Sequence, residues 1–404
     1  MRTVVCALVV AASCAALAMA QPTDGTPEAK YWSSFRGPQE GVAAWDNAPT
    51  DWDGPSGKGV VWKAPLKLAG VSSPVVWGDH VYLTEGTDKE RAVLAFDAAT
   101  GKLLWRQVVP YGGKGTLPAV SDAGLALPTP TCDADGVYAL FGTGDLAAFT
   151  PDGKPKWTLF LQKPQIGYGF SSSPCVAEGL VLVQFDCLVD GRVLAVETAT
   201  GKIRWEVPRA RSASWASPIL IPGADGKPLL VVNGSGSVTA FDLQGNVVWD
   251  LDGVTGEVAP SPAYTDGHVY SVNQGSILLC TRAWETPGEV WRYADHQSDT
   301  SSPVAVRGLV LMVGSDGQLA CVDAVNGKEL WTYQIGGCYA SLVASGDRVY
   351  ALTREGTMHI LAAERTLRLI AKCDLGEGSD ATPAIADGRM YLRTRGHLWC
   401  LGER

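Results

Sequence analysis

The sequence predicts an all-β fold, an eight-bladed β-propeller of four-stranded antiparallel blades. A unit of four short strands recurs with a period of roughly 39 to 44 residues, the length range of four-stranded propeller blades. Its strands are rich in β-branched and aromatic residues and are bounded by Gly, Asp or Pro. The 46 Gly, 24 Pro and 14 Trp among 404 residues favour many turns, and no segment shows a sustained helical period.

The unit is clearest between Ser171 and Trp205. Two apolar runs flank a turn at 177–179, the strand 192–197 follows, and a closing strand carries Trp205. One such sheet cannot bury both of its faces by itself, so neighbouring repeats must cover them. The residue that marks the start of each unit is Pro74, Pro130, Pro174, Pro218, Pro262, Pro303, Leu342 and Pro383.

The two ends of the chain carry incomplete units. The last unit has three strands, and the segment 59–66 reads as a single closing strand with no blade of its own. Pairing this N-terminal strand with the three C-terminal strands closes the ring and removes exposed sheet edges. The predicted organisation is a signal peptide at 1–20, an irregular N-terminal arm at 21–58 and the propeller at 59–404.

The leader predicts export. Residues 1–20 contain one charged side chain, an apolar run and the small-residue cleavage site before Gln21 that is typical of a secretory signal. The apolar run is too short for a membrane anchor, and no other transmembrane segment is found. We therefore expect a periplasmic or secreted monomer. Lipid anchoring at Cys14 is the alternative, although the preceding residues lack the usual Leu.

The net charge is −9 and is spread along the chain, which argues against a nucleic-acid partner because such surfaces need a concentrated basic patch. Cys280, Cys321 and Cys400 occupy a third-strand position that is Ala in other units, which predicts small core residues. The five histidines form no pair with metal-binding spacing, and no nucleophile or phosphate-binding motif occurs.

Two residue types recur in nearly every unit and are interpreted as structural. A hydroxyl precedes each start position, which predicts a hydrogen bond at the start of the inner strand. The closing strands carry a tryptophan, which predicts packing between blades. The hydroxyls are Ser73, Thr129, Ser173, Ser217, Ser261, Ser302, Ser341 and Thr382, and the tryptophans are Trp62, Trp105, Trp157, Trp205, Trp249, Trp291 and Trp331.

The segment 95–105 (AFDAATGKLLW), together with 197–205 and 323–331, resembles the pyrroloquinoline-quinone-like (PQQ-like) propeller repeat family, in its BamB-like branch. This resemblance implies a non-catalytic eight-bladed scaffold. The quinoprotein dehydrogenases of the same repeat class are longer, and bind the quinone and a calcium ion over the ring, commonly beside a disulfide of adjacent cysteines. This chain has no adjacent cysteines, so we expect no cofactor, with PQQ and calcium as the alternative.

Functional residues are expected where the repeat is broken, because rigid rings place binding groups on their loops. The candidates lie at strand ends of the third and fourth units and in loops before inner strands. They are Gln184, Asp186, Arg209, Arg211, Trp215, Asn233, Tyr168, Glu257, Asp299, Tyr339 and Asp380. The alternative for each is loop solvation or an ion pair between blades.

These observations predict an exported, non-catalytic propeller that binds protein partners of the cell envelope or an extracellular ligand, as in outer-membrane protein assembly. One alternative is a PQQ-dependent oxidoreductase. The second is a propeller that binds or processes carbohydrate, for which Asp186 with Asp299 or Glu257 is the carboxylate pair to check.

Overall fold

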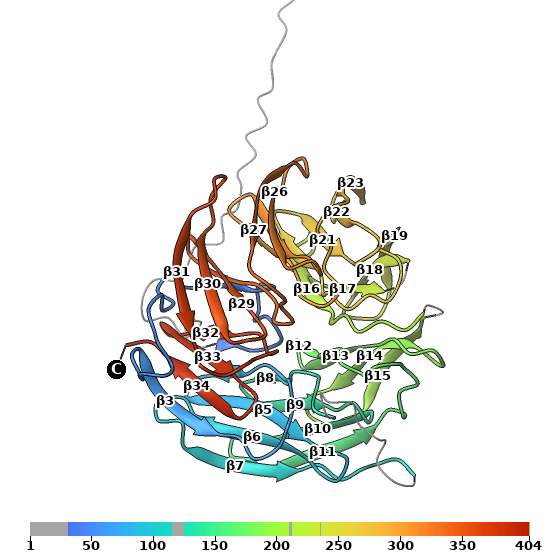
Figure 1. Ribbon diagram of the computed structural model, residues 1–404. Helices are drawn as coiled ribbons and strands as arrows, with labels where there is room; N and C mark the ends of the chain where they lie inside the picture. Colours follow the sequence, from blue (N-terminus) through green and yellow to red (C-terminus); the bar gives the residue numbers. More distant parts are fainter. Residues whose placement is uncertain (1–30, 115–124, 210–211, 235, 404) are drawn as a thin grey trace, which may run out of the picture.

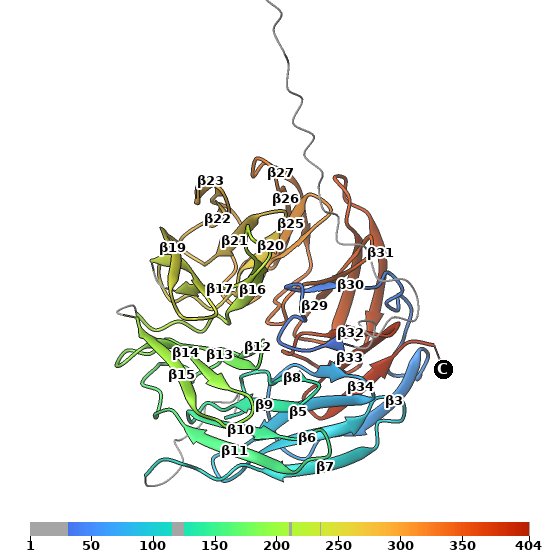
Figure 2. The ribbon, with the colours of Figure 1, turned by 180° about the vertical axis from the view of Figure 1, so that it is seen from behind.

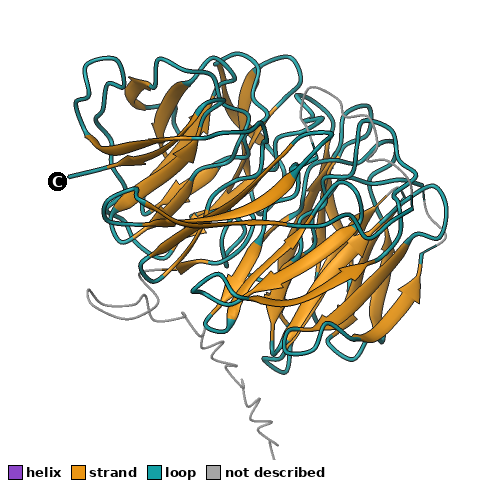
Figure 3. Cartoon of the chain, turned by 90° about the horizontal axis from the view of Figure 1, so that it is seen from below, coloured by secondary structure: helices purple, strands orange, loops and turns teal. Residues whose placement is uncertain are grey.

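The computed structural model describes residues 31–403 apart from 115–124, 210–211 and 235. All secondary structure in these residues is β-strand (Figure 3), and the strands form eight sheets arranged as a closed ring (Figure 1). This confirms the predicted eight-bladed propeller of four-stranded antiparallel blades.

The blades are numbered here in chain order. Blade 1 contains β4 (Val75–Trp77), β5 (His80–Gly86), β6 (Arg91–Asp97) and β7 (Leu103–Val108). Blade 2 contains β8 (Thr131–Asp133), β9 (Gly136–Leu140), β10 (Asp145–Phe149) and β11 (Pro155–Phe160). Blade 3 contains β12 (Cys175–Ala177), β13 (Leu180–Phe185), β14 (Arg192–Glu197) and β15 (Ile203–Pro208). Blade 4 contains β16 (Ile219–Pro222), β17 (Pro228–Gly234), β18 (Ser237–Asp242) and β19 (Val247–Asp252).

The second half of the ring repeats this order. Blade 5 contains β20 (Ala263–Thr265), β21 (His268–Val272), β22 (Leu278–Arg282) and β23 (Gly288–Tyr293). Blade 6 contains β24 (Val304–Val306), β25 (Leu309–Val313), β26 (Gln318–Asp323) and β27 (Glu329–Gln334). Blade 7 contains β28 (Val343–Ser345), β29 (Arg348–Leu352), β30 (Thr357–Ala362) and β31 (Leu369–Asp374). Blade 8 contains β32 (Ala384–Ala386), β33 (Arg389–Arg393), β34 (His397–Leu401) and β3 (Val60–Pro65).

Blade 8 closes the ring as predicted. The N-terminal strand β3 pairs antiparallel with β34, and Trp62 lies opposite Cys400. Figure 1 shows the blue β3 beside the red β34. The sheet of blade 8 therefore joins both ends of the propeller.

The recurring hydroxyls form a closed ring of hydrogen bonds around the channel. Each one accepts the backbone N–H of the equivalent residue in the preceding blade, at 2.8 to 3.1 Å. The eight bonds run from Ser73 to Thr129, Ser173, Ser217, Ser261, Ser302, Ser341, Thr382 and back to Ser73. The predicted structural bond is confirmed, and it joins neighbouring blades.

The tryptophans pack between blades as predicted. Trp157 of blade 2 shows the pattern. Its Nε1–H donates to the carbonyl of Thr198 in blade 3 at 2.9 Å, and the backbone of Gly201 in the same turn lies against its ring. A Cβ atom at Gly201 would approach this ring to 2.7 Å, which explains the glycine of the Thr-Gly-Lys turns. Trp249 departs from the pattern, because its Nε1–H has no partner among the described residues.

The eight cysteines of the described chain are buried and unpaired with one another. Cys280, Cys321 and Cys400 each lie opposite the tryptophan of the neighbouring outer strand, where they fill the small core position that the sequence predicts. Burial raises the pKa of each of these thiols to about 12, so they remain protonated.

Residues 31–58 of the N-terminal arm are more ordered than their irregular sequence suggests, and they lie against inner strands of the ring. The arm's strand β1 (Tyr31–Trp32) pairs with β4, and β2 (Val42–Ala43) pairs with β28. Between them the buried Arg36 donates to the carbonyls of Pro262 and Pro303, the residues that follow two ring hydroxyls. Figure 2 shows the arm in blue on the rear of the ring.

Candidate functional site

The ring encloses a cavity of about 1260 Å³ on its axis. The eight ring hydroxyls and Phe35 of the arm line its inner part. Its outer part is lined by loops between blades and by turns between second and third strands, which share one end of the antiparallel blades. We call this end the mouth face. The channel is thus a cup that opens on the mouth face.

Six of the predicted site residues line this cup. They come from successive interblade loops around the mouth and are Tyr168, Trp215, Glu257, Asp299, Tyr339 and Asp380. Tyr168 precedes blade 3 and Tyr339 precedes blade 7, so the two tyrosines lie half a ring apart. The sequence analysis selected these six residues because each lies in a loop between blades, and the structure places all six in the lining of the cup.

The aromatic side chains of the rim are held in place by their neighbours. The Nε1–H of Trp215 donates to the carbonyl of Gly169 at 2.8 Å, and its ring contacts Tyr168 at a centroid distance of 6.0 Å. Tyr168 has a φ of 58°, which is uncommon for an aromatic residue, and it is 75% exposed. The fold thus projects a tyrosine into solvent from a strained backbone conformation.

The opposite rim carries an ion pair under an aromatic ring. The Arg354 guanidinium bonds both carboxylate oxygens of Asp380, at 2.7 and 3.3 Å, and stacks on Tyr339 at 3.8 Å. The hydrogen bond to Asp380 raises the pKa of Arg354, so the guanidinium stays charged. Arg395 of blade 8 also lines the cup.

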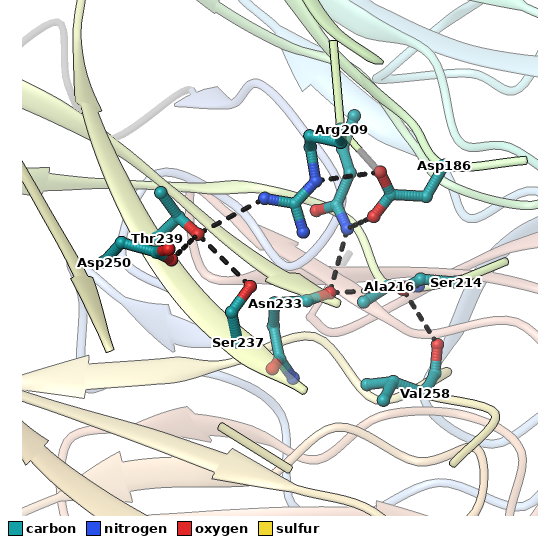
Figure 4. A network of polar contacts seen from close by, with 10 residues as sticks. Asp186, Arg209, Ser214, Ala216, Asn233, Ser237, Thr239, Asp250 and Val258 are labelled. Atoms are coloured by element: carbon teal, nitrogen blue, oxygen red, sulfur yellow. Dashed lines mark hydrogen bonds and ion pairs between the residues drawn. The ribbon is translucent and has the colours of Figure 1, made fainter. Parts of the chain in front are cut away.

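The structure places four other predicted residues inside the wall between blades 3 and 4 (Figure 4). The Gln184 amide donates to the carboxylate of Asp186 at 2.7 Å and to the carbonyl of Asn233 at 2.8 Å. Arg209 donates to Asp186 at 2.9 Å, and all four side chains are buried. The alternative interpretation, an ion pair, therefore holds here, although this pair joins two strand ends of blade 3 and Arg209 reaches blade 4 through Thr239. Arg211 lies outside the described residues.

Sequence reasoning missed part of the cup. The ring hydroxyls were interpreted as structural only, and Phe35, Arg354, Arg395 and Asn273 were not singled out, although all line the cavity. Arg354 and Arg395 follow the second strands of adjacent blades, a signal that blade alignment can reveal. Phe35 lies in a segment without strand periodicity, so no pattern points to the channel.

No three or more His, Cys, Asp and Glu side chains among the described residues are placed to hold a metal ion. Within the same residues, no helix is long and apolar enough to cross a membrane. The cup therefore offers hydroxyl, aromatic and carboxylate groups for binding.

Fold and repeat together define a PQQ-like repeat propeller. Residues 50–220 and 189–404 match the family described as outer membrane protein assembly factor BamB, and the chain belongs to this family. The BamB of Yersinia pestis is 28% identical over 299 residues, which are 70% of this chain and 69% of that protein.

Two solved structures share the fold. BamB from Moraxella catarrhalis superposes with a TM-score of 0.62 at 15% identity, covering 85% of this chain and 97% of that one. The quinohemoprotein alcohol dehydrogenase from Comamonas testosteroni gives a TM-score of 0.64 at 14% identity, covering 93% and 81%. At these identities both likenesses concern the fold alone.

Proposed function

We propose that this chain is an exported, non-catalytic scaffold, a monomer that binds protein partners in outer-membrane protein assembly. The observation that carries the proposal is the exposure of apolar side chains on the mouth face. Tyr168 is 75% exposed, Leu188 67%, and Val189 and Tyr339 44% each. Exposed aromatic and aliphatic groups on a rigid ring are typical of protein-binding surfaces. Membership in the BamB family supports the choice of partner.

Site-specific photocrosslinking tests this function. A photoreactive phenylalanine analogue replaces Leu188 on the mouth face, or Val325 as the control, in cells that produce the full chain. Val325 is 79% exposed but lies in the turn between β26 and β27, at the opposite end of the blades. We expect adducts with an outer-membrane assembly protein at position 188 and not at 325. Equal adduct patterns at both positions would contradict the proposal.

The quinoprotein alternative fits the residues of the cup poorly. The quinone carries several carboxylates and needs cationic partners, and its calcium ion needs a cluster of oxygen ligands. In the described cup, Arg354 is already paired with Asp380, so Arg395 is the one lining arginine without an ion-pair partner, and no cluster of carboxylates suits a metal ion. We therefore propose that the scaffold works without a cofactor. Calorimetry with PQQ and calcium chloride tests this, and calcium-dependent heat of binding would reverse it.

Export is tested separately by fractionating cells and sequencing the N-terminus of the purified protein. We expect the mature chain to begin at Gln21. A lipid-modified N-terminus at Cys14 would instead mean that the exported protein is anchored to a membrane.

A further inference from the structure

The bottom of the cup has hydrogen-bond donors with no protein acceptor. Each ring hydroxyl accepts one backbone N–H, and in the described part of the chain none of the eight donates its own hydrogen to another protein group. All eight residues are at least nine-tenths buried and line the cavity. A hydroxyl can donate one bond while it accepts others, so this ring retains its donor capacity.

A side chain that lines the same space carries an acceptor without a partner. Asn273 of blade 5 is 2% exposed and lines the cavity, and its Nδ2 donates to the carbonyl of Thr255 at 2.7 Å. Its Oδ1 has no partner among the described residues. Leaving such a buried acceptor unsatisfied is costly, which favours a ligand or water that donates to it. The cup therefore combines uncharged donors and an uncharged acceptor.

Aromatic surfaces border these polar groups at both ends of the cup. Phe35 lines the inner part, while Tyr168, Trp215 and Tyr339 line the rim. The rim rings are held by Gly169 and Arg354, so their positions are set before any ligand binds. An occupant must present flat apolar faces and also several hydroxyl-type donors and acceptors.

From this geometry we propose that the cup binds a neutral glycan chain. Sugar rings offer C–H faces that stack on aromatic side chains and hydroxyls that both donate and accept. The volume of about 1260 Å³ exceeds the roughly 300–1,000 Å³ of most small-molecule sites, so the ligand is an oligosaccharide rather than one sugar. Glu257 and Asp299 at the rim can accept hydrogen bonds from further sugar hydroxyls. Asp186, buried in the blade wall, takes no part.

Two other ligand classes fit less well. An anionic ligand would meet the exposed carboxylates of Glu257 and Asp299. Of the two arginines that line the cup, Arg354 is paired with Asp380, and only Arg395 has no carboxylate partner among the described residues. An extended peptide would need a free sheet edge, but the innermost strands have only three or four residues. Two of these strands, β4 and β28, already pair with the arm.

The test begins with a glycan array that carries neutral and acidic oligosaccharides, probed with the labelled full chain. Calorimetry follows with chitohexaose, cellohexaose and maltohexaose as neutral probes and with tetragalacturonate as the acidic probe. We expect one neutral probe to bind. The variants Tyr339→Ala and Tyr168→Ala should each weaken it about tenfold, as loss of an aromatic contact does. Val325→Ala, at the opposite end of the blades, should leave binding unchanged.

Thermal unfolding of each variant shows that it is folded, which is expected because both tyrosines are exposed. Asn273→Asp supplies a second readout, since a carboxylate there should make binding depend on pH. The proposal is overturned by an array without neutral ligands, by binding of tetragalacturonate alone, or by neutral binding that the rim variants leave intact. The glycan proposal can fail or succeed independently of the scaffold proposal, because the crosslinks at Leu188 are measured without any oligosaccharide.

Discussion

Replacing Ser217 by alanine tests how the hydroxyl ring stabilises the propeller. The substitution removes the Oγ atom that accepts the N–H of Ser173 at 2.8 Å, and both residues are at most 5% exposed. A buried donor left without an acceptor costs about 1–3 kcal/mol. Because the ring lines the cavity, water can reach the amide, which places the expected loss at about 1–2 kcal/mol.

Urea unfolding followed by tryptophan fluorescence measures this loss, and hydrogen exchange of the peptide that contains Ser173 localises it one blade away from the substitution. Ser217→Thr is the matched control, since Thr129 and Thr382 occupy equivalent ring positions. The threonine variant should retain the stability of the original protein. If alanine and threonine lower the free energy of unfolding equally, or if exchange at Ser173 is unchanged, the ring bonds do not hold the blades.

Three further perturbations address the other contacts between elements. Arg209→Ala leaves the buried Asp186 carboxylate without its guanidinium and should cost about 3–5 kcal/mol in urea unfolding, whereas Arg204→Ala, which removes an exposed ion pair with Glu197, should cost less than about 1. Gly201→Ala (φ 71°) forces a Cβ atom onto Trp157 and should destabilise by at least about 2 kcal/mol, while Gly226→Ala (φ 79°), with open space around it, should lose only the smaller backbone contribution. Burial raises the pKa of Glu40 from 4.5 to about 8, against the opposing effect of Arg36. Between these pH values the folded state holds one more proton than the unfolded state. The free energy of unfolding should therefore fall as the pH rises through this range, by up to about 1.4 kcal/mol per pH unit. Glu40→Gln should remove this part of the slope, and equal slopes in both proteins would contradict the assignment.

Strand content, blade number and ring closure could be predicted from the sequence because they follow from local chemistry repeated eight times. The turn glycines and closing tryptophans are fixed by contacts that recur at the same spacing, as Gly201 against Trp157 shows. The orphan strand 59–66 was recognisable because it carries the repeat's own tryptophan, Trp62. The repeated glycines and tryptophans in the sequence therefore predict the contact between blades that is repeated around the ring.

The position of the arm and the surroundings of Asp186 could not be predicted in this way. Arg36 bonds carbonyls that are more than 200 positions away in the chain, and no local pattern encodes such a contact. Asp186 ends a second strand, where Arg354 and Arg395 of other blades reach the cup. Whether that strand end faces solvent or the blade wall depends on a side chain that is distant in the sequence, here Arg209 after the fourth strand of the same blade.

The position of Gln184 in its strand is polar in four of the eight blades, where it is Thr84, Gln184, Asn233 and Arg393. Strand pairing makes Gln184 of blade 3 equivalent to Arg393 of blade 8, since each lies two residues after the residue that faces the small core position. Gln184 donates to the carbonyl of Asn233 in blade 4, and Arg393 donates to the carbonyl of Thr84 in blade 1.

At this position four other blades have the apolar residues Leu140, Val272, Val313 and Leu352. An apolar joint tolerates any similar neighbour, but a buried amide or guanidinium is costly unless the correct carbonyl meets it. Arg393 makes this demand where blade 8, which holds both ends of the propeller, meets blade 1. The polar contacts between blades therefore destabilise arrangements in which a blade packs against the wrong neighbour. The hydroxyl ring, in contrast, contributes the same backbone hydrogen bond between every pair of neighbouring blades.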